Sequence, residues 1–133
     1  MVSLNSSKSV SAIFITFSGN CRKALTHYQA CFGGTLQFET FGRELEGYTE
    51  MPVVSGSLVS DSIIIHGSDL VHNEGRTVGN YISIFMHCPT AYQRRSLMEK
   101  LTSGKTGYSA ADVYNQKLVE IIDPFDVRWV LYV

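Results

Sequence analysis

The sequence predicts an α+β fold made of two βαβββ modules in tandem. Short runs of β-branched and aromatic residues indicate strands, and two segments with apolar residues three and four positions apart indicate helices. The same order of elements occurs in both halves, which is the pattern of an internal repeat. A length of 133 residues, 44% of them hydrophobic and 17% charged, suits a single domain over residues 1–133. The modules are expected over about residues 10–70 and 79–133.

The first module begins with a strand over residues 10–17, where β-branched and aromatic residues dominate. Asn20 then suits the N-cap of a helix over residues 21–32, and Gly33-Gly34 ends that helix, because glycine adopts a positive φ without steric cost. The remaining strands are expected at residues 36–41, 53–59 and 63–67, with an exposed loop over 42–52 and a hairpin turn at 60–62.

The second module follows a polar linker over residues 69–79 and begins with a strand over 81–86. Pro89-Thr90 precedes a helical pattern that runs from Ala91 to Leu101 and stops in the glycine-containing segment 103–107. Two more strands are expected over residues 116–122 and 127–133, joined by a turn at 123–126. A third strand would fit between residues 108 and 115, where the periodicity is weak.

The charge pattern argues against nucleic acid and membranes as partners. The chain has 11 basic and 12 acidic residues, a net charge of -1, and its basic residues are scattered, so it produces no strong field for phosphate groups. The N-terminal residues are polar and serine-rich, unlike a signal peptide, and no apolar run is long enough to span a membrane. Three cysteines without metal-ligand spacing are expected to be free thiols in the cytoplasm.

Residues 17–25 (FSGNCRKAL), Tyr28 and residues 31–34 (CFGG) resemble the signature of the PhnB-like group, F-x-G-N-C followed by F-G-G. This group belongs to the vicinal oxygen chelate superfamily of glyoxalase, bleomycin-resistance and dioxygenase proteins. Weaker matches lie at residues 67–69 and 126–129. The resemblance implies the glyoxalase/bleomycin-resistance fold, in which the βαβββ modules form cupped mixed sheets. The motif residues themselves are expected to be architectural, because they form the two ends and the buried face of one helix.

The resemblance also implies where a metal would bind. In metal-using members, His or Glu side chains from the first and last strand of each module point into the cup. The corresponding positions here are expected to be Ala12, Ile65, Tyr81 and Val130. Three of these side chains have no donor atom, so we expect no metal, no other cofactor and no catalytic residue. By strand alternation, His66 is expected on the face that packs on the helices and His87 near the mouth of the cavity.

Strand alternation predicts an aromatic lining with a few hydroxyl groups for the cupped face. The expected ligand-binding residues are Phe14, Thr16, Tyr81, Ser83, Phe85 and Tyr132. Such a lining suits a small apolar or aromatic molecule. The alternative is that these side chains simply fill the cup of a protein that has no ligand.

Two classes of function follow. The first is a dimeric small-molecule-binding protein that performs no chemistry. The alternative is a metal-dependent lyase, isomerase or dioxygenase of the same superfamily, which would need a metal ion as Lewis acid. A methyltransferase is not supported, since no glycine-rich cofactor loop follows a strand. The resemblance implies a homodimer, and whether the modules pair within one chain or between two chains stays open.

Overall fold

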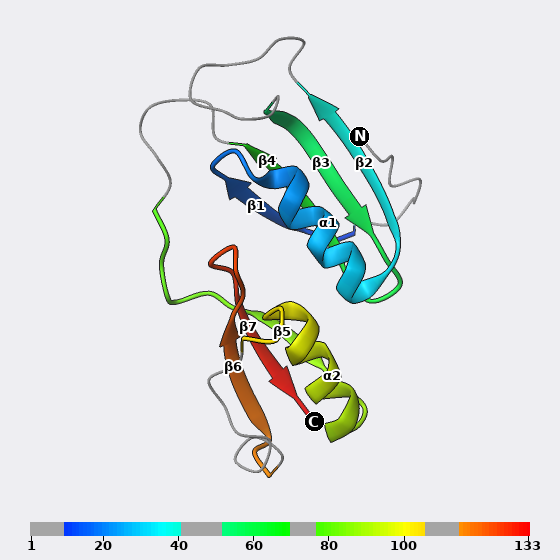
Figure 1. Cartoon of the computed structure of the whole chain (residues 1–133), viewed down its shortest axis with the longest axis vertical. Coiled ribbons are helices and arrows are strands. Elements are labelled where there is room, and N and C mark those ends of the chain that lie inside the picture. The colour runs from blue at the N-terminus through cyan, green and yellow to red at the C-terminus, as the bar shows by residue number, and fades with distance from the viewer. Residues whose placement is uncertain (1–9, 41–51, 70–76, 106–114) are drawn as a thin grey trace. The chain divides into compact units, whose positions relative to one another are not determined.

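The computed structural model describes residues 10–40, 52–69, 77–105 and 115–133. The chain divides into two compact units, Met1–Thr77 and Val78–Val133, each of which is described by itself (Figure 1). Each unit is a mixed sheet with one helix, so the predicted α+β fold class is confirmed. Neither helix in the described ranges is long and apolar enough to cross a membrane.

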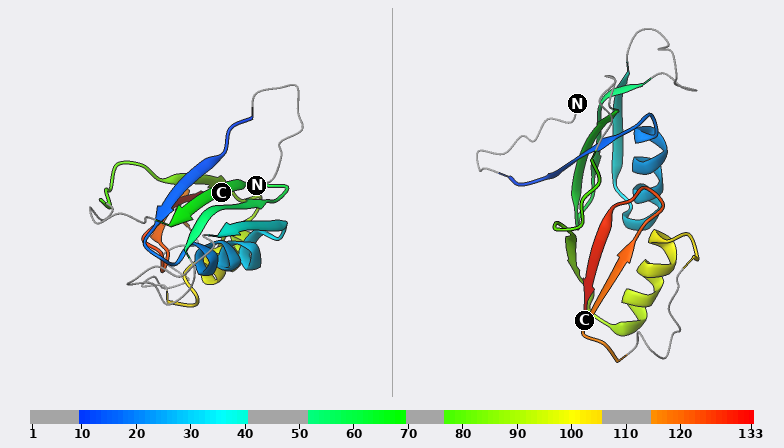
Figure 2. Two further views of the ribbon diagram at one scale, coloured as in Figure 1. Left: turned by 90° about the horizontal axis from the view of Figure 1, so that it is seen from above. Right: turned by 90° about the vertical axis from the view of Figure 1, so that its left-hand side faces the viewer.

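The first unit is a four-stranded sheet in the order β1-β4-β3-β2, with a helix on one face (Figure 2). β1 and β4 are parallel, and the other neighbours are antiparallel. Its elements are β1 (Ile13–Phe17), α1 (Cys21–Phe32), β2 (Thr35–Thr40), β3 (Val53–Val59) and β4 (Ile64–Asp69). The predicted helix and third strand have the predicted bounds. The first strand starts three residues later than expected, and Asp69, expected in the linker, ends β4.

The second unit is a three-stranded sheet in the order β5-β7-β6, again with a parallel pair and an antiparallel pair. Its elements are β5 (Ile84–His87), α2 (Ala91–Leu101), β6 (Leu118–Ile122) and β7 (Arg128–Tyr132). This order reproduces β1-β4-β3 of the first unit, which is the structural basis of the repeat. β5 starts at Ile84 rather than at residue 81. The possible strand over residues 108–115 lies almost entirely outside the described residues, as do most of the loop at 42–52 and the linker at 69–79.

α1 packs closely on its sheet. Ala24, Leu25 and Tyr28 form its buried face and are fully buried. A β-carbon on Gly56 of β3 would lie 2.9 Å from Cδ1 of Leu25, closer than carbon atoms approach one another. Glycine therefore lets Leu25 pack directly on β3, and a larger residue would force this side chain to shift.

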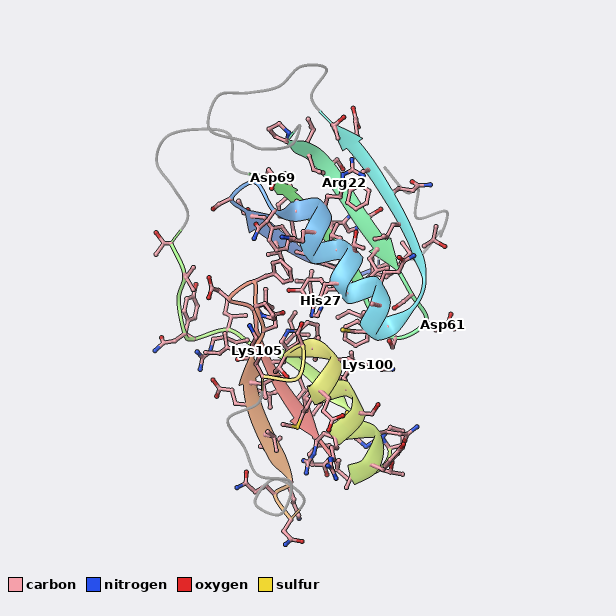
Figure 3. All side chains as sticks on the ribbon, viewed as in Figure 1. Arg22, His27, Asp61, Asp69, Lys100 and Lys105 are labelled. Atoms are coloured by element: carbon pink, nitrogen blue, oxygen red, sulfur yellow. The ribbon has the colours of Figure 1, made fainter. Side chains whose placement is uncertain are left out.

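The N-terminus of α1 is held by a residue far away in the sequence. Asn20 occupies the N-cap position, but its side chain makes no capping hydrogen bond. Instead, Oδ1 of Asp69 accepts hydrogen bonds of 2.9 Å from the backbone N–H groups of both Gly19 and Cys21 (Figure 3). Oδ2 of Asp69 accepts a third, of 2.8 Å, from the N–H of Val53. The motif F-S-G-N-C is thus architectural, as predicted, because it presents two N–H groups to one buried carboxylate.

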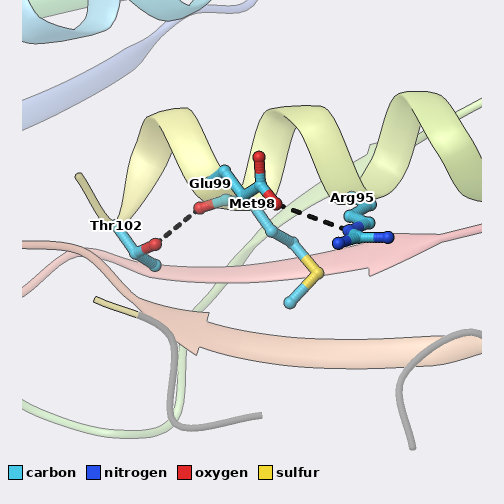
Figure 4. A network of polar contacts seen from close by, with 4 residues as sticks. All are labelled: Arg95, Met98, Glu99 and Thr102. Carbon is cyan, nitrogen blue, oxygen red and sulfur yellow. Dashed lines mark hydrogen bonds and ion pairs between the residues drawn. The ribbon is translucent and has the colours of Figure 1, made fainter. Parts of the chain in front are cut away.

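α2 is capped by local hydrogen bonds. Oγ1 of Thr90 accepts a hydrogen bond from the N–H of Gln93 at 3.1 Å, as in an ordinary N-cap. At the other end, the hydroxyl of Thr102 donates to the carbonyl of Met98 at 2.7 Å (Figure 4). Ser103 and Gly104 then adopt positive φ angles of 55° and 78°, which ends the helix in the predicted segment.

Candidate functional site

Each sheet has one face against its helix and one face turned away from it, which we call the distal face. In the first sheet, the fully buried Phe17 and Ile65 mark the helix side. The alternate positions point the other way, and pairing places Phe14 beside His66 and Thr16 beside Ser68. Ser57 lies opposite His66 on β3 and belongs to the same face. Within the part of the chain that the structure describes, these five residues form the centre of the first distal face.

Two sequence predictions fail at this point. Ile65 was expected to face the cup and His66 to face the helix, and the structure has them the other way round. The reason is the length of two loops. Residues 60–63 separate the paired Val59 and Ile64, whereas residues 123–127, one residue more, separate the paired Ile122 and Arg128. An alignment of the two modules that matches Asp61 of one turn to Asp126 of the other is therefore one residue out of register, and such a slip exchanges the two faces.

The first distal face carries an exposed aromatic ring beside polar groups. Phe14 is 63% exposed, and Thr16 is half-buried. His66 is half-buried, and Ser57 is fully buried, with no hydrogen-bond partner for its Oγ among the described residues. Two of the predicted binding residues, Phe14 and Thr16, thus lie on this face. Sequence reasoning missed His66 and Ser57, which strand pairing alone reveals.

The second distal face is mainly aromatic and aliphatic. It lies opposite the buried residues Val119, Ile121, Trp129 and Leu131. Phe85, 60% exposed, stacks on Tyr132, 37% exposed, with 6.0 Å between ring centroids. The centroid of the His87 ring lies 5.4 Å from the centroid of the Tyr132 ring.

Two predicted residues of the second unit do not lie on a strand. Tyr81, 87% exposed, and the half-buried Ser83 precede β5, so strand alternation does not place them on the distal face. Conversely, Leu118 and Ile122 of β6 are exposed and pair with Tyr132 and Arg128 on this face. Sequence reasoning missed both, because the segment 118–122 has apolar residues on both faces of the strand and shows no alternation that would separate them.

An ion pair crosses the second distal face. Nη2 of Arg128 on β7 contacts Oε1 of Glu120 on β6, and both side chains are partly exposed. A carboxylate held by a guanidinium is occupied as a hydrogen-bond acceptor and is a poor general base. Glu120 therefore acts here as a charged group that fixes the position of Arg128.

The described residues do not provide the donor set of a usual metal centre. A divalent transition-metal ion takes three or four nitrogen, sulfur or carboxylate ligands. Within ranges 10–40, 52–69, 77–105 and 115–133, no three His, Cys, Asp or Glu side chains converge. The distal faces offer His66 in one unit, and His87 with the paired Glu120 in the other, so this part of the chain does not fit such an ion.

A shallow pocket of about 420 Å³ lies at the start of β1 and the β3–β4 turn, and its lining includes Ala12, Ser60 and Asp61. The hydroxyl of Ser60 donates to the carbonyl of Ile63 at 2.7 Å and accepts from its N–H at 3.0 Å. The turn itself therefore uses this hydroxyl. The pocket has no aromatic side chain, so it does not match the predicted lining.

No protein-family model matches the sequence, and no curated protein matches it. Solved structures do match. Protein PA1353 from Pseudomonas aeruginosa has a TM-score of 0.73 at 22% identity, covering 94% of this chain and 97% of that one. A putative 3-demethylubiquinone-9 3-methyltransferase, the PhnB protein from Bacillus cereus, has a TM-score of 0.62 at 16% identity, covering 93% and 98%.

The fosfomycin resistance protein FosX from Listeria monocytogenes has a TM-score of 0.59 at 11% identity, covering 96% of this chain and 93% of FosX. Likeness at these identities concerns the fold, and it extends over nearly the whole length of each protein. The chain therefore has the glyoxalase/bleomycin-resistance fold, which it shares with the PhnB and FosX proteins of the vicinal oxygen chelate superfamily.

Proposed function

We propose that the chain is a PhnB-like small-molecule-binding protein of the glyoxalase/bleomycin-resistance superfamily that works without a catalytic metal. Its ligand is a small apolar or aromatic molecule that packs on a distal face. The observation that carries the proposal is the exposure of aromatic rings on these faces: Phe14 at 63% and Phe85 at 60%.

An exposed phenylalanine on a sheet is a source of binding free energy. Covering one completely is worth roughly 1.5–3 kcal/mol, and a favourable aromatic pair adds about 0.5–1.5 kcal/mol. Phe85 and Tyr132 already stack on one another, so a planar ligand finds an ordered aromatic surface. Ordered side chains lose little conformational entropy on binding, which favours affinity.

The first distal face adds hydrogen-bonding capacity. His66 is half-buried beside Phe14, and an imidazole ring both donates and accepts hydrogen bonds. A ligand with an aromatic ring and one polar substituent fits this pair better than a pure hydrocarbon. The small aromatic molecule is therefore expected to carry a hydroxyl, carbonyl or carboxylate group.

The experiment measures binding of an anilinonaphthalene sulfonate dye, which joins an aromatic system to an anionic group. Phe14→Ala and Phe85→Ala are each expected to weaken dye binding about tenfold at the distal face that carries the residue, which corresponds to a loss of about 1.4 kcal/mol. The matched control is Tyr92→Ala, because Tyr92 is 77% exposed but lies on α2. Equal binding by all three variants and the unchanged protein would contradict the proposal.

A homodimer in the cytoplasm is part of the same proposal. Leu118 and Ile122 are more than half exposed, and unpaired sheet edges with apolar neighbours favour association. Three cysteines outside disulfide bonds suit a reducing compartment. Sedimentation equilibrium of the full chain tests the dimer, and a monomer at micromolar concentration would rule it out.

A metal-dependent enzyme of the same superfamily is the second candidate. Its support is that His66 and His87 lie on the distal faces, and the Listeria FosX has been solved in a complex with Mn(II). Elemental analysis of protein purified without chelators separates the two candidates. Stoichiometric manganese, zinc or iron that is lost in His66→Ala or in His87→Ala would favour the enzyme over the metal-free binding protein.

A further inference from the structure

The centre of the first distal face contains a buried hydroxyl group without a hydrogen-bond partner. Ser57 of β3 is fully buried, and its Oγ makes no hydrogen bond with any residue that the structure describes. A hydroxyl in this state has lost its contact with water and gained nothing in return, which destabilises the folded protein. A ligand atom that supplies the missing partner removes this penalty, so the binding of a polar group is favourable at this position.

Strand pairing surrounds Ser57 with polar side chains and one aromatic ring. In its own row across the sheet, His66 of β4 lies on one side, with Phe14 of β1 beyond it. Gln37 of β2 lies on the other side. The row therefore combines an aromatic surface, an imidazole and the buried hydroxyl on three neighbouring strands.

The neighbouring row of the same face carries further hydroxyl groups. Thr16 of β1 pairs with Ser68 of β4, and the register of β3 and β4 continues this row to Ser55. Ser55 pairs in turn with Glu39 of β2. Thr16, Ser68 and Ser55 are half-buried, so solvent reaches all three residues. The face thus offers several hydrogen-bonding groups to a ligand beside the buried one of Ser57.

We propose that the first distal face selects an aromatic molecule that carries hydroxyl groups on alternate ring carbons. Such a ligand is one member of the class named in the proposed function, on which this inference rests. The ring packs against Phe14, one hydroxyl pairs with Oγ of Ser57, and a second pairs with the imidazole of His66. The ligand then satisfies the buried hydroxyl and covers the exposed phenylalanine at the same time.

The spacing of the strands favours alternate over adjacent ring carbons. Ser57 and His66 pair across neighbouring strands, which lie about 4.8 Å apart. Two hydroxyl oxygens on alternate carbons of an aromatic ring are separated by nearly the same distance, whereas oxygens on adjacent carbons are much closer together. Adjacent hydroxyls therefore cannot both form a straight hydrogen bond, one with each side chain.

A side-chain rotation gives the ligand access to Ser57. Gln37, its neighbour on β2, is exposed, and exposed side chains change rotamer within nanoseconds. When Gln37 turns away from the sheet, the ligand hydroxyl takes its place beside Oγ of Ser57, and the backbone keeps its conformation.

The charges of this face favour hydroxyl groups over acidic ones. Glu39 is exposed, and a carboxylate only accepts hydrogen bonds. The described strands place no lysine or arginine on the first distal face. An acidic ligand would therefore meet a like charge with no such cation to balance it, whereas a ligand hydroxyl donates to the carboxylate.

The test measures the affinity of the full chain for three aromatic compounds by titration calorimetry. Resorcinol has two hydroxyls on alternate carbons, catechol has two on adjacent carbons, and phenol has one. The unchanged protein should bind resorcinol about tenfold more tightly than catechol or phenol, and Ser57→Ala should bind all three equally. Ser18→Ala is the matched control, because Ser18 is an exposed serine outside the strands, and it should keep the preference.

A second measurement needs no ligand. Ser57→Ala should melt at the same temperature as the unchanged protein or at a higher one, because the substitution removes an unpaired hydroxyl and leaves no partner behind. A lower melting temperature would overturn the inference, since it would mean that the hydroxyl already has a partner. Equal affinities of the unchanged protein for resorcinol and catechol would overturn it as well.

The outcomes distinguish this inference from the proposed function. Phenol binding that is weakened in Phe14→Ala, without a preference for resorcinol, would contradict the inference alone. Binding that is weakened in neither Phe14→Ala nor Phe85→Ala would contradict the proposed function too. A preference for catechol that requires added Mn²⁺ would overturn the inference and favour the metal-dependent enzyme, because two adjacent oxygens chelate one ion.

Discussion

The indole Nε1 of Trp129 donates a 2.9 Å hydrogen bond to Oδ2 of Asp123, and both residues are buried. The other oxygen of Asp123 accepts from the N–H groups of Phe125 at 2.8 Å and Val127 at 3.2 Å. One carboxylate thus joins the loop between β6 and β7 to the core of the second unit. It also stabilises the longer loop in which Asp126 adopts a φ of 65°.

Asp123→Ala should therefore destabilise the second unit strongly. Three donors lose their acceptor, and at least the buried indole cannot replace it with water. We expect a loss of about 2–4 kcal/mol in the free energy of unfolding. Urea titration followed by the fluorescence of Trp129, the single tryptophan, measures it. Asp61→Ala, in the exposed β3–β4 turn, is the control and should change stability by less than about 0.5 kcal/mol.

The capping arrangement of α1 gives a prediction opposite to the usual rule. Replacing an N-cap Asn by Ala ordinarily costs about 0.5–2 kcal/mol. Asn20→Ala should cost almost nothing here, because its buried Oδ1 has no hydrogen-bond partner among the described residues. Asp69→Ala should cost about 2–4 kcal/mol, because it leaves three backbone N–H groups without their acceptor.

Equilibrium unfolding of both variants, followed by far-ultraviolet circular dichroism, tests this difference. If Asn20→Ala proves as destabilising as Asp69→Ala, the side chain of Asn20 caps the helix after all. A small effect of both substitutions would show that water replaces the carboxylate of Asp69.

Substitution by alanine should destabilise the protein to different extents at the two glycines that follow α1. Both have positive φ, 74° at Gly33 and 100° at Gly34, so alanine costs about 1–2 kcal/mol in backbone strain at either position. A β-carbon at Gly33 meets no described heavy atom within 4 Å. At Gly34, by contrast, it would collide with the carbonyl oxygen of Val59 and lie 2.8 Å from Cβ of Ser60.

Gly34→Ala should therefore lower the free energy of unfolding by about 1–3 kcal/mol more than Gly33→Ala does, because this is the typical cost of overpacking. Thermal unfolding of the two single variants under identical conditions measures the difference. Equal melting temperatures would mean that the chain between α1 and β2 moves away from Val59 without cost.

Local patterns predicted most of the secondary structure. α1 and β3 have the predicted bounds, because a helical face in the first and a continuous β-branched run in the second are encoded in adjacent residues. The support of Asp69 for the N-terminus of α1 was not predictable, because the partners are 48 and 50 residues apart in the sequence. Propensity scales contain no term for such a contact.

The candidate site was less predictable than the fold. Phe14 and Phe85 were placed on the distal faces correctly by alternation, since each lies within a regular strand. His66 was placed on the wrong face, because its position depends on a difference of one residue between two loops. Tyr81 was placed on a strand that begins three residues after it. Errors of one to three residues at element ends leave the fold intact but change which side chains form a site.

The buried thiol of Cys21 should make the stability of the chain depend on alkaline pH. Its pKa is raised from 9.0 to about 12, mainly by burial and also by the negative charge of Asp69. Above pH 9 the unfolded chain releases this proton while the folded chain keeps it. The contribution to stability is therefore complete below about pH 9 and is lost as the pH rises toward 12.

At pH 10 this difference in proton binding amounts to about 1.4 kcal/mol. The destabilisation caused by Cys21→Ala should therefore be about 1.4 kcal/mol smaller at pH 10 than at pH 7, because the variant has no thiol to titrate. Urea unfolding of both proteins at the two pH values measures this change, with Thr26→Ala as a variant whose effect should be the same at both. An effect of Cys21→Ala that is equal at pH 7 and pH 10 would mean that solvent reaches this thiol in the folded protein.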